Sequence, residues 1–166
     1  MKHSKIARLL ALACVGILMT AALAGCAQQN SAANEQQAKS RQYMSSVNQA
    51  MEDLSSRLES FEDAVSRGDA VTMRTQADNA FKALDALAAI EVPEGLGDVQ
   101  AGYVDGTNKL KEALNAYIGL YTEIDSATEE HPFDYATYDE RIKSIQELYD
   151  EGVSLLEETD KKATEL

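Results

Sequence analysis

The chain has few of the residues on which several common kinds of protein depend. It contains no tryptophan, two prolines and two cysteines among 166 residues. Two cysteines are too few for a disulfide framework, and both lie near the amino terminus, at Cys14 and Cys26. Basic residues are also scarce, because 15 lysines and arginines face 28 aspartates and glutamates, for a formal net charge of −13. This excludes a nucleic-acid interface, which needs clustered positive charge.

The remaining composition suits one ordinary folded domain. Hydrophobic residues make up 45% of the chain and charged residues 26%, which is enough apolar material to bury a single core. The low proline content and the nine glycines favour helices over a loop-rich fold.

The first 25 residues differ from the rest in composition. Lys2, Lys5 and Arg8 give a basic start, and residues 9–24 follow with Thr20 as their only polar interruption. About 16 apolar residues are too few for a membrane span, which needs about 20, and are typical of a secretory signal peptide. We therefore expect residues 1–25 to be a cleaved leader.

The end of this leader carries a second signal. The stretch Leu23-Ala24-Gly25-Cys26 resembles the lipobox of bacterial lipoproteins. The resemblance implies cleavage just before Cys26, a diacylglyceryl group on its thiol and often a third acyl chain on the new amino terminus. Two or more acyl chains anchor a protein stably to a membrane. Ala27 is not the aspartate that in this family signals retention at the inner membrane, so an outer membrane is allowed where the cell has one.

We expect three parts in the chain: the signal peptide (1–25), the lipidated cysteine with a polar tether (26–34) and a helical domain (35–166). Cleavage removes three bases and no acid, which leaves 12 − 28 = −16 charges. Such a surface repels anionic lipid. The acyl chains, rather than a basic patch, are expected to hold the domain at the extracytoplasmic face of the cell membrane.

From residue 43 onward, apolar residues recur at spacings of three and four, which predicts amphipathic helices. The apolar stripes cover residues 44–65, 73–88, 99–124 and 138–156. Gly68 is a typical helix stop and Asp69 a typical N-cap for the second helix, which should end near Ile90 because Pro93 follows. Thr137 and Glu140 fit a capping box for the fourth helix.

No segment alternates with the period of two that strands require. Four helices with short connections predict an all-α fold, an antiparallel up-down-up-down four-helix bundle.

Residues that would support catalysis or metal binding are scarce. His131 is the only histidine after the signal peptide, and it lies in a turn between glutamates and Pro132. The chain after the signal peptide offers almost no residues for a catalytic nucleophile with its general base. The Glu-x-x-His pairs of di-iron bundles do not occur either. The acids around Glu157, Glu158 and Asp160 are interpreted as a solvated face. We expect no enzyme activity, no metal and no cofactor.

Tyrosines and glycines on the last two helices form the candidate binding residues. The tyrosines should meet across that helix pair with their hydroxyls directed towards water or a partner. Glycine within a helix costs about 1 kcal/mol relative to alanine, so it needs a reason: either the backbones approach closely or the glycines floor a cleft walled by tyrosine. The candidates are Tyr103, Tyr117, Tyr121, Tyr138, Tyr149, Gly102, Gly106 and Gly152.

Together these patterns predict a non-enzymatic, membrane-anchored lipoprotein of the cell envelope that acts as a structural or protein-binding module. We expect an envelope protein as its partner, and no nucleic acid. The alternative is a carrier of a small ligand or metal ion that uses the Tyr/Gly cleft or the acidic face.

Overall fold

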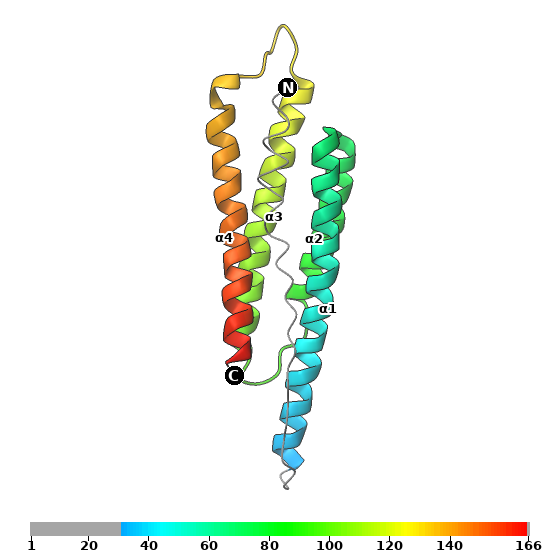
Figure 1. Ribbon diagram of the computed structural model, residues 1–166, viewed down its shortest axis with the longest axis vertical. Helices are drawn as coiled ribbons and strands as arrows, with labels where there is room; N and C mark the ends of the chain where they lie inside the picture. The colour runs from blue at the N-terminus through cyan, green and yellow to red at the C-terminus, as the bar shows by residue number, and fades with distance from the viewer. Residues whose placement is uncertain (1–30, 166) are drawn as a thin grey trace.

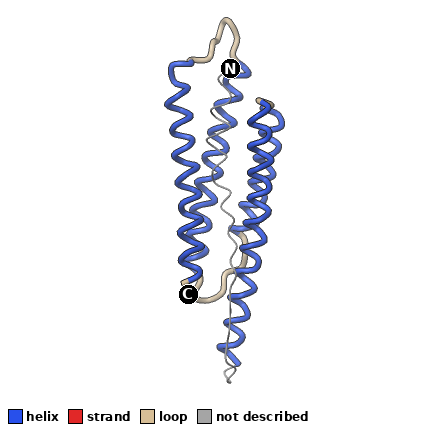
Figure 2. Tube along the Cα trace, viewed as in Figure 1, coloured by secondary structure: helices blue, strands red, loops and turns tan. Residues whose placement is uncertain are grey.

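The computed structural model describes residues 31–165, and the fold that they form is all-helical, as the sequence predicts. It consists of α1 (Ser31–Arg67), α2 (Ala70–Ala88), α3 (Gly97–Ser126) and α4 (Tyr138–Thr164), with a 3-10 helix, η1 (Tyr135–Thr137), directly before α4. Residues 31–165 contain no strand (Figure 2). The predicted signal peptide, the processing site and Cys26 lie outside the described residues.

Helix α1 is longer than its apolar stripe predicts. The stripe is confirmed, because Val47, Leu54 and Phe61 are buried. The helix nevertheless begins at Ser31, twelve residues before Tyr43, so the last part of the expected tether is helical. Figure 1 shows this first part of α1 extending past the end of the other helices. Alanine, glutamine and glutamate are good helix formers, and they explain a helix here without an apolar face.

The hairpin between α1 and α2 follows the predicted signals. Gly68 has a φ of +67°, the left-handed conformation in which a glycine commonly ends a helix. Its N–H donates to the Val65 carbonyl at 3.0 Å. The side chain of Asp69 accepts from the Thr72 N–H at 3.0 Å and caps α2. Helix α2 ends at Ala88, two residues before the expected end, because the chain must turn before Pro93.

The predicted capping box at the start of α4 is wrong. Thr137 lies in the right-handed helical region and its side chain makes no capping hydrogen bond. Its hydroxyl instead donates to the Asp134 carbonyl at 2.9 Å. Asp134 caps η1 by accepting from the Ala136 N–H at 2.9 Å. Since η1 precedes α4 without a break, the cap belongs three residues earlier than the sequence pattern indicates.

Neighbouring helices along the chain pack against each other, and the first and last do not. The helix pairs α1/α2, α2/α3 and α3/α4 have Cα atoms within 8 Å of each other, whereas α1 and α4 have none. Packed helices have axes 8–10 Å apart, which brings facing Cα atoms closer than this. The helical bundle is therefore open between the backbones of α1 and α4, and only side chains fill that side.

The core follows from this arrangement. Helix α3 supplies the largest share of the buried side chains, because it packs against both α2 and α4. In α4 the stripe is less covered: Tyr149 and Leu156 are buried, whereas Tyr138, Ile142 and Ile145 are only half-buried. None of the helices within residues 31–165 combines the length and apolar character that crossing a membrane requires.

Candidate functional site

The three glycines of the candidate set lie at the contact between α3 and α4. A Cβ atom on Gly106 would lie 2.8 Å from the Leu156 side chain and 3.2 Å from the Gly152 carbonyl oxygen. A Cβ on Gly152 would lie 3.0 Å from the backbone nitrogen of Leu110, and one on Gly102 would overlap the Thr159 hydroxyl. Side chains thus occupy the space above each glycine, which corresponds to close backbone approach rather than to the floor of a cleft.

Tyr103 lies on the inward face of α3 and is completely buried. Its hydroxyl donates to Oδ1 of Asp160 on α4. Tyr43 of α1 lies close enough for its hydroxyl to raise the pKa of Tyr103, although burial is the larger cause. Helices α1, α3 and α4 therefore each bring one polar side chain to the same level of the bundle. We call Asp160, Tyr103 and Tyr43 the Asp160 site.

A hydrogen-bonded chain fixes Tyr43 in this site. The Tyr43 hydroxyl donates to Oε1 of Gln100 at 2.7 Å, and Nε2 of Gln100 donates to the Ala88 carbonyl at 2.7 Å. That carbonyl is at the end of α2, where helix carbonyls lack partners within the helix. Burial raises the pKa of Tyr43 to about 12, so the hydroxyl stays protonated and acts as a donor at neutral pH.

Asp160 is the least expected member of the site. Its side chain is only 7% exposed, and its second oxygen, Oδ2, has no hydrogen-bond partner within the described part of the chain. No basic side chain among residues 31–165 forms an ion pair with it. Burial raises the pKa of Asp160, the hydrogen bond from Tyr103 opposes this, and the charge of Glu157 adds to the rise.

The interpretation of Asp160 as part of a solvated acidic face is wrong, whereas Glu157 and Glu158 are exposed as expected. A signal was present in the sequence. Asp160 continues the spacing of three and four that runs through Tyr149, Gly152 and Leu156, so it falls on the inward stripe. A charged residue at a position of the inward stripe indicates a buried charged group, as Asp160 is.

Two other tyrosines of the candidate set, Tyr117 and Tyr121, lie farther along α3. Tyr103 and Tyr117 are 14 residues apart, or about 21 Å along a helix. Tyr117 stacks on Tyr121 with ring centroids 5.0 Å apart, and the Phe61 ring of α1 meets Tyr117 edge-on at 5.8 Å. Because spacing within one helix does not name its partner, the sequence did not predict this contact between α1 and α3.

The hydroxyls of this group differ in their access to water. Tyr117 is buried, and its hydroxyl has no hydrogen-bond partner within residues 31–165. Burial raises the pKa of Tyr117 strongly, with smaller contributions from Tyr121 and Tyr138, whose hydroxyls are nearby but outside hydrogen-bonding geometry. Tyr138 is half-buried at the start of α4, and burial raises its pKa to about 12. Tyr149 is buried in the middle of α4.

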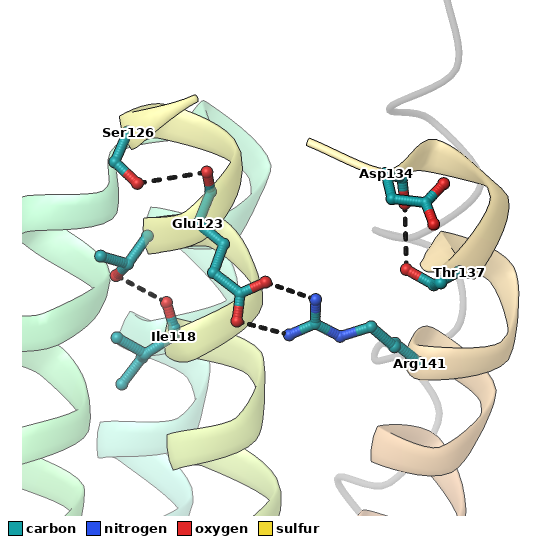
Figure 3. A network of polar contacts seen from close by, with 7 residues as sticks. Ile118, Glu123, Ser126, Asp134, Thr137 and Arg141 are labelled. Atoms are coloured by element: carbon teal, nitrogen blue, oxygen red, sulfur yellow. Dashed lines mark hydrogen bonds and ion pairs between the residues drawn. The ribbon is translucent and has the colours of Figure 1, made fainter. Parts of the chain in front are cut away.

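The connection between α3 and α4, residues 127–137, forms a braced aromatic tip. Arg141 of α4 donates to both carboxylate oxygens of Glu123 on α3, at 2.5 and 2.9 Å (Figure 3). The hydrogen bond from Arg141 holds the pKa of Glu123 below its usual value. The Arg141 guanidinium also lies over the Phe133 ring, at 5.9 Å from the ring centroid.

Tyr135 is the exposed residue of this tip. Its ring meets Phe133 edge-on at 5.0 Å, yet the residue remains 70% exposed. At the other side of the loop, the backbone N–H of Thr128 donates to the His131 carbonyl at 3.0 Å, and the His131 N–H donates to the Thr128 hydroxyl at 3.1 Å. The loop therefore presents a large, exposed aromatic side chain that packs on one side against the Phe133 ring.

Metal ligands do not gather in the part of the chain that the structure describes. No group of three or more histidine, cysteine, aspartate or glutamate side chains within residues 31–165 is placed to hold a metal ion. His131 itself is exposed in the tip.

Comparisons of the chain with models of known protein families, with curated proteins and with solved structures found no match.

Proposed function

We propose that the protein is a non-enzymatic, lipid-anchored module of the cell envelope that binds a protein partner through its aromatic tip. In this proposal Cys26 is lipidated, and the domain is held at the extracytoplasmic face of the membrane. The four helices form an antiparallel up-down-up-down bundle, which acts as a spacer between the anchor and the tip. The resemblance of Leu23-Ala24-Gly25-Cys26 to a lipobox supports the anchor.

The observation that carries the proposal is the exposure of Tyr135. Large aromatic side chains that stand exposed in a fixed position are enriched at protein interfaces, where they insert into a pocket of the partner. The brace between Arg141 and Glu123 and the ring contact with Phe133 hold the loop before any partner arrives. Such preorganisation lowers the entropy cost of binding.

The charge around the tip defines the class of partner. No lysine or arginine occurs between residues 112 and 140, while five exposed acids flank the aromatic residues in the sequence. Arg141, the first base after this stretch, is already paired with Glu123. A protein surface that accepts Tyr135 should therefore be positively charged around an apolar pocket. The acids are Glu129, Glu130, Asp134, Asp139 and Glu140.

The two ends of the molecule fit the two roles. Ser31 follows Cys26 by 31 − 26 = 5 residues, which span at most about 18 Å. The start of α1 is therefore close to the proposed anchor. In Figure 1 the start of α1 lies at one end of the molecule and the tip lies at the opposite end. A partner would meet the tip well away from the membrane surface.

Site-specific photo-crosslinking in intact cells tests the tip. A photoreactive amino acid replaces Tyr135 in the full chain, and a matched chain carries it at Ala38, an exposed position near the start of α1. We expect one dominant crosslinked protein from position 135 that is absent from position 38. In a separate experiment, a Tyr135→Ala chain without the photoreactive group should no longer copurify with that protein. The same crosslinks from both positions, or none from position 135, would overturn the proposal.

The anchor has a separate test. Mass spectrometry of the amino-terminal peptide from native membranes should find Cys26 as the first residue with acyl chains attached, and Cys26→Ser should leave the chain unacylated. An unmodified thiol with residues 1–25 still attached would disprove the proposed anchor. This result would leave the proposed binding role of the tip unaffected.

A further inference from the structure

We propose that the Asp160 site binds an organic ammonium ion, with Oδ2 of Asp160 as the acceptor for its N–H groups. This ligand site is independent of the anchor and of the tip, and it lies at the opposite end of α4 from the tip (Figure 1).

The first step of the argument is the unused oxygen. A buried polar atom without a partner is rare in a folded protein and asks for an explanation. Oδ1 of Asp160 accepts from Tyr103, so the carboxylate is already oriented, while Oδ2 has no partner among the described residues. A ligand that donates hydrogen bonds would complete this half-satisfied carboxylate.

The second step is the sign of the charge. Glu157, one turn before Asp160, adds negative potential, and Asp160 lies near the C-terminal end of α4, where the helix dipole is negative. The nearest basic residue with an ion pair, Lys162, is directed to Asp98 at 3.6 Å. The negative potential of Glu157 and of the helix end therefore favours a positive donor over a neutral one at Oδ2.

The third step separates an organic cation from a metal ion. Calcium and magnesium take six or more oxygen ligands, and the described residues do not bring three or more metal-ligating side chains together here. An ammonium group needs only a few acceptors and is also attracted to the faces of aromatic rings. Tyr43 and Tyr103, from α1 and α3, are the aromatic residues of this site.

The fourth step is access. The backbones of α1 and α4 do not come within 8 Å of each other, so no helix backbone covers the site on that side. Side chains can rotate to admit a ligand at far lower cost than helices can separate. The strongly acidic chain also raises the local concentration of small cations around the domain.

Calorimetric titration of the full chain in a non-ionic detergent tests the site, with putrescine and choline as probes and sodium chloride at the same ionic strength as the reference. We expect putrescine to bind with one site per chain. Choline should bind more weakly, because its quaternary nitrogen has no N–H to donate. A change in tyrosine fluorescence should accompany binding.

The decisive variants are Asp160→Asn and its matched control, Glu158→Gln, which removes the same charge from an exposed position two residues away. Asp160→Asn should weaken putrescine binding by about 10-fold or more, the scale of one charged hydrogen bond, while Glu158→Gln should change it by less than about 2-fold. Equal losses in both variants would mean that putrescine is only a counterion of the acidic surface, and the proposal would be wrong.

A second measurement does not depend on the folding of any variant. Binding to the native chain should weaken as the pH falls, and should do so above the range of an ordinary aspartate, because burial raises the pKa of Asp160 and its protonation removes the acceptor. Tyr103 and Tyr43 stay protonated throughout this range, and Glu158→Gln provides the control for the exposed acids. The absence of any saturable binding of putrescine at millimolar concentrations and neutral pH would also overturn the proposal.

Discussion

Helix α4 has two contrasting sides. On the side of α3, glycines and a threonine let the backbones approach until a single added methyl group would overlap a neighbour. The backbones of α4 and α1, by contrast, remain apart, and buried aromatic side chains of α3 and α1, such as Tyr103 and Phe61, occupy the interior of the bundle. The same spacing of three and four thus produces two different helix separations. Residue size, rather than periodicity, determines how close the helices come.

The largest expected effect tests the aromatic side. Phe61→Ala should lower the free energy of unfolding by about 3–5 kcal/mol, because it leaves a void beside Tyr117. Urea unfolding followed by circular dichroism measures the loss. A loss below about 2 kcal/mol would mean that the open side of the bundle collapses around the void, and would weaken the contrast between the two sides.

A pair of glycine substitutions tests the close side. Gly152→Ala should destabilise the fold by about 1–2 kcal/mol, since overlap with Leu110 outweighs the gain in helix propensity. Gly119→Ala, which lies within α3 and has nothing within 4 Å of the new Cβ, should stabilise it by up to about 1 kcal/mol. Thermal unfolding of both variants gives the comparison. Two shifts of the same sign would contradict close packing as the role of Gly152.

The next prediction concerns Asp160, which lies where the two sides meet. Burial raises its pKa in the folded state, so the folded chain binds this proton more tightly than the unfolded chain does. The stability that Asp160 contributes therefore falls as the pH rises from its unfolded pKa, about 3.9, through the folded value. Asp160→Asn should raise the free energy of unfolding at neutral pH, by less than the change from Gly152→Ala, and this advantage should shrink as the pH falls through the folded pKa of Asp160 and be lost near about pH 4.

Urea midpoints across the pH range measure this effect, with Glu158→Gln as the control. A variant no more stable than the native chain at neutral pH would mean that the carboxylate is not desolvated, and that the interior near α1 is wetter than the burial of Asp160 indicates.

The smallest effect is expected at the tip, which belongs to neither side. Tyr135→Ala should change the free energy of unfolding by less than about 0.5 kcal/mol, because the side chain is 70% exposed. If Tyr135→Ala no longer copurifies with the crosslinked protein while its stability is unchanged, a binding role for Tyr135 is established. A large drop in the unfolding midpoint would instead make Tyr135 a structural residue.

Much of the fold could be predicted from the sequence, because burial leaves a periodic record. Val47, Leu54 and Phe61 lie on the inward stripe of α1, and Gly68 and Asp69 mark its end as expected. The early start of α1 could not be found in this way. A helix that is exposed over its first turns has no apolar stripe, so the helix propensity of its residues is the only signal of it in the sequence.

The candidate site was less predictable. The glycines and tyrosines were identified from composition and spacing, but the partners Thr159 and Asp160 were not, because a contact between helices depends on their separation and rotation. Asp160 was misjudged because two exposed glutamates stand close to it in the sequence. The same holds for Thr137, where local spacing favoured a cap that the preceding η1 makes unnecessary.

The first twelve residues of α1 have a consequence for dynamics. Among the described residues, Gln36 joins this part to the rest of the domain, because its Nε2 donates to the Glu94 carbonyl at 2.6 Å. An isolated helix of this length is marginal in water, so these turns should open and close much faster than the packed part of α1. Amide exchange should therefore slow steeply near Tyr43, where the helix enters the bundle. A pulling force at the amino terminus would therefore unfold these least stable turns first, while the core of the bundle stays folded.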